Sequence, residues 1–297
     1  LAPHSKERDA QVISSHYDVG NDFYELFLGD SMAYTCAYYP TPDATLDEAQ
    51  ENKFRLVFEK MNLKPGDKHL DVGCGWGSMV RYAARQGVKS LGVTLSKEQA
   101  EWAQAKIKEE GLEDLAEVRF LDYRDVTETD FDGISSIGLL EHIGVKNFAS
   151  YFEFLAGKLR PGGVMVNHCI TYPDNHKTPQ GDFINRYIFP DGELTGSGTI
   201  IYEMQDHGFE VFHEENIRFD YMRTLHDWCE NLKANWDEAV ALVGENTAKL
   251  WGMYMAGSEW GFEHDVVELH QVVGIKLASD GSRAGAPERR WWNDSVF

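Results

Sequence analysis

The sequence predicts an α/β fold: a Rossmann-like, seven-stranded sheet with helices on both faces and an added helical layer that covers the substrate. Three observations support this fold. A short apolar strand runs into a glycine-rich turn and then a helix between His69 and Gln86. Strand and helix patterns alternate from there to Ile170, which is typical of a largely parallel sheet. Aromatic-rich helical patterns follow in residues 220–262.

We expect a single domain, because 297 residues with 42% hydrophobic content suit one large core. Residues 1–60 form a helical N-terminal cover, and residues 61–171 form the cofactor-binding core. Residues 172–278 contain a lid, inserted helices and the last strands, and residues 279–297 form a tail. The tail is predicted to be a poorly ordered extension. Since the chain begins without Met, an upstream domain missing from this sequence is also expected.

The N-terminal cover is predicted to be helical. Residues 7–30 alternate aromatic and polar groups in a way that suits short helices joined by an Asx-type turn. From Leu46 to Leu63 apolar residues recur near helical spacing, and Thr45 is placed to cap that helix.

The stretch from His69 to Gly77 is predicted to bind a cofactor. Its glycines let the backbone approach a ligand where a Cβ would clash, and the turn aims the first N–H groups of the next helix at that ligand. A dinucleotide site usually carries an acid about 20 residues further on, at the tip of the next strand. Gly92–Ser96 contains no acid, whereas Asp71 precedes the glycines. This pattern favours a class I methyltransferase turn over an oxidoreductase turn or a turn without a ligand.

The rest of the chain continues the alternation. The predicted core elements are helices at 79–86, 96–110 and 148–159, and strands at 90–95, 117–121, 133–138 and 164–170. The later elements are a lid at 172–198, a strand at 210–217, two helices within 220–262 and a last strand at 266–275. Ligands bind beyond the carboxyl ends of the strands in such sheets. We therefore expect three segments to face one crevice: Leu121–Arg124, Leu140–Gly144 and Asn167–Thr171.

Charge and cysteine content narrow the class of protein. With 28 basic and 49 acidic residues the formal net charge is -21, which disfavours binding to nucleic acid. The cysteines are scattered, as expected of reduced thiols rather than of a disulfide framework or a metal site. They are Cys36, Cys74, Cys169 and Cys229. No apolar run of about 18 residues is present, so we expect a cytoplasmic protein.

The chain resembles the cyclopropane-fatty-acyl-phospholipid synthases, the mycolic acid cyclopropane synthases and related fatty-acyl methyltransferases. Matching segments occur in the family's order over nearly the whole chain. They are Ser15–Asp18, Tyr34–Tyr38, Leu70–Gly77, Gly92–Ser96, Glu141–Gly144, Ile188–Pro190 and Tyr254–Ser258. Two departures are Ser258, where some members have cysteine, and Leu139–Leu140, where Met-Phe is usual. The second departure could reshape the acyl pocket and change the product.

The resemblance implies transfer of a methyl group from S-adenosylmethionine to the double bond of an unsaturated fatty acyl chain on a phospholipid. It also implies a cofactor site formed by Tyr34, Thr35, Asp71, Gly73, Cys74, Gly75, Thr94, Leu95, Ser96, Gln99, Tyr123 and Arg124. Trp76 and Trp102 are expected to pack rather than to contact the cofactor. Methyl transfer leaves a carbocation, which aromatic faces can stabilise. Candidates for that role are Tyr34, Tyr38, Tyr187 and Tyr254.

A bound bicarbonate is the base that the resemblance implies. Its expected ligands are Cys36, Glu141, His168, Ile170 and Tyr254. Glu141 and His168 follow neighbouring predicted strands, so both should reach the same crevice. The structural alternatives are that Glu141 caps the next helix and that His168 is a satisfied core histidine.

Two products and one non-enzymatic role remain open. Direct loss of a proton from the new methyl with ring closure gives a cyclopropane, whereas proton loss after a hydride shift along the chain gives a methylene branch, the precursor of a tuberculostearate-type acid. The second product would require a partner reductase. A lipid or cofactor sensor is disfavoured by retention of Glu141, His168 and Tyr254. We also expect transient contact with the inner face of the cell membrane, through the basic and aromatic tail around Trp291, and a homo-oligomer.

Overall fold

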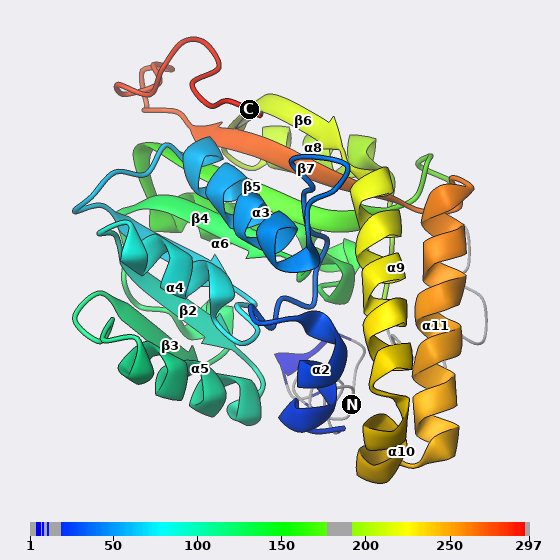
Figure 1. Ribbon diagram of the computed structural model, residues 1–297. Coiled ribbons are helices and arrows are strands. Elements are labelled where there is room, and N and C mark those ends of the chain that lie inside the picture. The colour runs from blue at the N-terminus through cyan, green and yellow to red at the C-terminus, as the bar shows by residue number, and fades with distance from the viewer. Residues whose placement is uncertain (1–3, 7, 9–10, 12–18, 177–191, 295–297) are drawn as a thin grey trace.

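The computed structural model describes residues 4–6, 8, 11, 19–176 and 192–294 (Figure 1). A seven-stranded sheet with the order β3-β2-β1-β4-β5-β7-β6 forms its centre. β7 pairs antiparallel with β5 and β6, and the other pairs are parallel. The strands are β1 (Lys68–Val72), β2 (Lys89–Thr94), β3 (Ala116–Phe120), β4 (Phe131–Ile137), β5 (Leu159–Thr171), β6 (Phe209–Asn216) and β7 (Glu268–Lys276). This is the predicted class I methyltransferase architecture.

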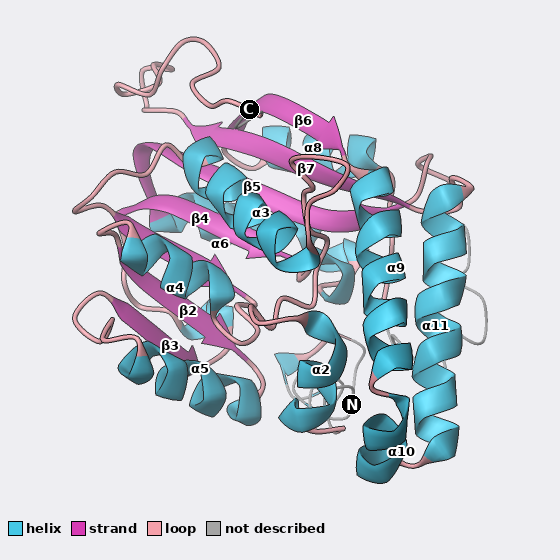
Figure 2. Ribbon diagram, viewed as in Figure 1, coloured by secondary structure: helices cyan, strands magenta, loops and turns pink. Residues whose placement is uncertain are grey.

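Helices cover both faces of the sheet (Figure 2). α3 (Leu46–Lys60), α4 (Ser78–Arg85) and α5 (Lys97–Glu109) lie on one face, and α6 (Phe148–Lys158) and α8 (Ser197–Asp206) on the other. Three short 3-10 turns follow two of the strands: η1 (Tyr123–Asp125) follows β3, and η2 (Leu140–His142) and η3 (Val145–Asn147) follow β4. None of the described helices is long and apolar enough to cross a membrane.

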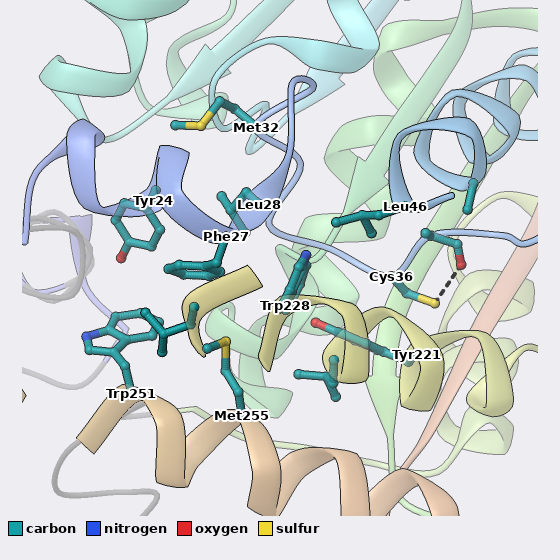
Figure 3. Close-up of a cluster of buried hydrophobic side chains, with 14 of the residues drawn as sticks. Tyr24, Phe27, Leu28, Met32, Cys36, Leu46, Tyr221, Trp228, Trp251 and Met255 are labelled. Atoms are coloured by element: carbon teal, nitrogen blue, oxygen red, sulfur yellow. Dashed lines mark hydrogen bonds between the residues drawn. The ribbon is translucent and has the colours of Figure 1, made fainter. Parts of the chain in front are cut away.

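An added helical layer stands beyond the carboxyl ends of the parallel strands (Figure 1). It consists of α2 (Asn21–Leu28), α9 (Arg218–Ala234), α10 (Trp236–Val243) and α11 (Glu245–Glu263). Several of their aromatic side chains form one buried cluster, in which Tyr24, Phe27, Trp228 and Trp251 lie against one another (Figure 3). This layer gives the end of the sheet an apolar wall.

The predicted helix caps are confirmed. The Thr45 side chain accepts a hydrogen bond from the Glu48 N–H at 3.2 Å, and the Glu48 carboxylate accepts one from the Thr45 N–H at 2.8 Å, which makes a capping box. Ser96 caps α5 in the same way by accepting from the Gln99 N–H. Local sequence therefore fixes where both helices begin.

The prediction of two helices within 220–262 was wrong, because this region contains α9, α10 and α11. Asn235 separates the first two, and its side chain donates to the Leu26 carbonyl. Gly244 separates the last two with φ +83°, a conformation that ends a helix and favours glycine.

The prediction of a poorly ordered tail was also wrong for residues 279–294. Trp292 is buried, and Trp291 stacks on Phe212 with ring centroids 5.2 Å apart. The Trp291 indole N–H donates to the Glu59 carbonyl, and Arg283 pairs with Glu210 at 2.9 Å. The tail thus packs on β6 and α3, so its tryptophans are used inside the protein and do not form an exposed membrane-binding cluster.

Candidate active site

The glycine turn after β1 has the geometry expected of a cofactor site. Gly73, Gly75 and Gly77 have φ values of +68°, +55° and +78°, a backbone region that favours glycine. A Cβ added at Gly75 would meet no atom within 4 Å, so this part of the turn borders open space. The residue before α4 is Gly77, which has no side chain to cap the helix, so the first N–H groups of α4 are left for a ligand. A nucleoside-bearing cofactor fits this cradle.

Asp71 is a buried residue of β1, two positions before Gly73. Its carboxylate accepts a hydrogen bond from the Ser135 hydroxyl at 2.6 Å, and Ser135 is also 2.8 Å from His69 Nε2. Burial raises the pKa of Asp71 to about 7 and lowers that of His69 to about 3. Asp71 thus has a buried hydrogen-bond partner beneath the turn, and its predicted contact with the cofactor stays a prediction.

The end of β2 and the start of α5 form a second wall. The Thr94 hydroxyl donates to Gln99 Oε1 at 2.8 Å, and the same hydroxyl oxygen accepts from the Ser96 N–H. Since the carboxamide oxygen of Gln99 is used, its nitrogen is the group offered to a ligand. Leu95 lies between these residues in the same turn.

The segment after β3 contributes η1. Arg124 pairs with Asp122, with 2.6 Å between Arg124 Nη2 and Asp122 Oδ2, and its guanidinium lies 5.4 Å from the Tyr123 ring centroid. Tyr123 also packs edge-on against Tyr151. Asp122 lies in the segment that was expected to face the crevice, but it was not named as a cofactor-binding residue, although an acid directly after a strand is a readable signal.

Side chains of α3 form hydrogen bonds with the Tyr34–Thr35 segment. The Lys53 ammonium donates to the Thr35 hydroxyl at 2.6 Å, and the Gln50 amide donates to the Thr35 carbonyl at 2.9 Å. Lys53 is fully buried, and burial lowers its pKa to about 7. The Tyr34 ring stacks on Trp228 at 5.5 Å. The sequence does not mark Lys53, because a lysine on a helix normally faces solvent.

Trp76 and Trp102 form hydrogen bonds with α2 of the added helical layer. The Trp76 indole is buried and donates to Asn21 in α2, and the Trp102 indole donates to Glu25 in the same helix. Both contacts agree with the predicted packing role.

Glu141 and Ile170 meet at the carboxyl end of β5. Glu141 Oε1 accepts a hydrogen bond from the Ile170 N–H at 2.6 Å. Glu141 Oε2 is buried and has no hydrogen-bond partner among the described residues, and burial raises the pKa of this carboxyl to about 7. α6 has no side-chain cap, so the alternative that Glu141 caps the next helix is not seen. The Ile170 amide, expected to donate to an anion, instead donates to Glu141.

His168 lies on β5, and its Nδ1 is 3.1 Å from the amide nitrogen of Gln271 in β7. Its Nε2 is buried without a partner in the part of the chain that the structure describes. Burial lowers the pKa of His168 well below its ordinary value, so the ring is neutral. An unpartnered Nε2 does not fit the alternative of a satisfied core histidine.

The other predicted base-site residues lie in the aromatic cluster. Cys36 is a buried free thiol that donates to the Ala37 carbonyl at 3.0 Å (Figure 3). Tyr254 packs on Trp251 with ring centroids 6.1 Å apart, and Ile170 contacts the same cluster. Tyr187 and the segments Ser15–Asp18 and Ile188–Pro190 fall outside the described residues.

Comparison with known proteins identifies the family. A family model described as mycolic acid cyclopropane synthetase matches residues 4–272. The chain belongs to this family. A probable fatty acid methyltransferase of Mycobacterium tuberculosis is 59% identical over 97% of this chain and 68% of the relative. The cyclopropane-fatty-acyl-phospholipid synthase of Escherichia coli K12 is 36% identical over 94% of this chain and 71% of its own.

A solved member of the mycolic acid cyclopropane synthetase family has the same fold. The crystal structure of a mycolic acid cyclopropane synthase complexed with SAH and CTAB superposes with a TM-score of 0.83 at 32% identity, covering 92% of this chain and 99% of the other. The protein is accordingly an S-adenosylmethionine-dependent methyltransferase of the cyclopropane synthase type.

Proposed function

We propose that this enzyme converts the double bond of an unsaturated fatty acyl chain, carried on a phospholipid, into a cyclopropane, with bicarbonate as the base. The observation that carries the proposal is Glu141 Oε2, which is buried at the carboxyl end of β5 and has no hydrogen-bond partner among the residues that the structure describes. A carboxylate without a partner in an apolar surrounding is costly unless a ligand uses it.

The cofactor supplies a sulfonium methyl group when it is bound. An alkene is a weak nucleophile, so the protein must hold the acyl chain in line with that methyl and exclude water. The apolar wall of α2, α9 and α11 suits both tasks, because its buried side chains include Tyr24, Trp228, Trp251 and Met255. Tyr34, which stacks on Trp228 of this wall, would offer an aromatic face to a carbocation on the acyl chain.

The chain's own groups also suit a proton-removal site. Bicarbonate held there would supply a weak base, which suffices because a carbocation bearing a new methyl is a strong acid. The Ile170 N–H orients Glu141 so that Oε2 can accept from the bicarbonate hydroxyl, and His168 Nε2 can donate to the anion. We assign Tyr254 and Cys36 to the same site because both contact the cluster that includes Ile170.

A methylene-branched product is the second candidate. The relative with 59% identity is named a probable fatty acid methyltransferase, not a cyclopropane synthase. In that case a hydride of the acyl chain first shifts to the cationic carbon, the new methyl then loses a proton to give the methylene branch, and a separate reductase completes the methyl branch.

Replacing Glu141 with Gln tests the base site. Turnover should fall by about 10²–10⁴-fold, the usual contribution of acid–base catalysis, while affinity for SAH measured by calorimetry stays unchanged. Added bicarbonate should stimulate the wild type and not the variant. Glu153→Gln on the exposed side of α6 is the matched control. Near-normal turnover of Glu141→Gln would contradict the assignment.

Mass spectrometry of lipids from a host that expresses the enzyme identifies the product. A gain of one methylene with ring-type fragmentation supports cyclopropanation, and an exomethylene chain supports branching. Unchanged lipids would contradict both.

A further inference from the structure

A row of buried polar side chains leads away from His168. His168, Gln271 and Glu215 are register partners on the neighbouring strands β5, β7 and β6. Side chains of such partners project from the same face of a sheet. His168 and Gln271 are almost completely buried, and Glu215 is partly buried.

Lys60, the last residue of α3, joins this row. Its ammonium is fully buried and donates to Gln271 Oε1 at 2.6 Å and to Glu215 Oε2 at 2.9 Å. The Tyr38 hydroxyl donates to the other oxygen of Glu215 at 2.6 Å. The Trp292 ring lies 5.8 Å from the Lys60 nitrogen, so the packed tail borders the row.

The row determines which end of Gln271 faces His168. An ammonium can only donate, so the carboxamide oxygen of Gln271 must face Lys60, and its NH₂ group must face the histidine. The NH₂ group can only donate as well. His168 Nδ1 therefore accepts, and the proton of the neutral ring must be on Nε2.

We propose that Lys60 and Gln271 are positioning residues that hold His168 in its neutral Nε2–H tautomer. This turns Nε2 into a hydrogen-bond donor toward the base site. The inference rests on the proposed function, since it deepens the role of His168 in binding the anion there. Neither residue is placed in contact with the reacting atoms.

Nitrogen NMR of the full chain, labelled with ¹⁵N-histidine, tests the tautomer without a substrate. The His168 signals are identified from their loss in His168→Gln. We expect an unprotonated Nδ1 and a protonated Nε2 in the wild type. A protonated Nδ1 would overturn the proposal, whatever product the enzyme makes.

The variants Gln271→Met and Lys60→Met test the positioning role. Each should abolish the single tautomer and lower turnover by about 10- to 100-fold, the range seen for outer partners of metal-binding histidines. SAH affinity should stay unchanged, and stimulation by bicarbonate should be lost. Gln104→Met is the control, since Gln104 accepts from the Val118 N–H of β3, at the opposite edge of the sheet from Lys60 and Gln271. A normal tautomer and turnover in Gln271→Met would overturn the proposal. If both variants fail to fold, the wild-type spectrum decides.

Discussion

The glycine turn at Gly73–Gly77 and the proposed base site at Glu141 and His168 both follow carboxyl ends of parallel strands, but they are built differently. The turn consists of backbone from one short stretch of chain. The base site depends on β4, β5, β7, α3 and the tail, which are far apart in sequence. A site made of local backbone conformation can be read from the sequence, whereas a site made of buried partners cannot.

The most severe test of the local site is Gly75→Val. The substitution costs about 1–2 kcal/mol of backbone strain and projects a side chain into the open space of the turn. We expect a folded protein that no longer binds SAH in calorimetry. Gly66→Val is the matched control, because Gly66 also has a positive φ and open space but lies in an exposed turn away from the site. SAH binding by the Gly75 variant would show that the turn is not the cofactor cradle.

The pH dependence of stability tests the burial of Glu141 in the assembled site. Burial raises the pKa of this carboxyl from 4.5 to about 7, so the folded state binds more protons than the unfolded state between these values. Ionising the buried carboxyl destabilises the folded state, so the free energy of unfolding should fall by roughly 3 kcal/mol as the pH rises through this range. Urea unfolding at pH 4.5 and 7.5 should show this loss in the wild type relative to Glu141→Gln. Parallel curves for the two proteins would mean that Glu141 is solvated.

Trp292→Ala tests whether the tail belongs to the assembled site. Loss of this buried ring should lower the free energy of unfolding by about 2 kcal/mol, less than for a central core tryptophan because the tail packs at the rim. Turnover should fall as well, since the ring borders Lys60. Trp260→Ala, at a 56% exposed position, should change neither. Loss of liposome binding with unchanged stability would instead favour a membrane role for the tail.

The smallest expected effect concerns the capping box of α3. Thr45→Ala should lower the free energy of unfolding by about 1 kcal/mol, and Thr45→Ser should restore it. Turnover below the melting transition should not change, because Lys53 and Lys60 lie further along the same helix. A large loss of turnover in Thr45→Ala would show that the assembled site responds to the position of the whole helix.

The sequence by itself determined the sheet architecture, the glycine turn, both helix caps and the order of the family segments. These features depend on dihedral preferences and on apolar spacing within a few neighbouring residues. The split of the helical layer at Gly244 was also readable but was not predicted.

Tertiary structure alone decided the surroundings of the predicted site residues. Asp71 turned out to be a buried partner of Ser135, the Ile170 N–H donates to Glu141, and the tail packs over α3. Lys53 and Lys60 are fully buried, although lysine on a helix usually faces water. Whether such a charge can be buried depends on partners that other segments bring to it, such as Gln271 for Lys60. No local pattern records that pairing, because it exists only once the strands and helices have packed together.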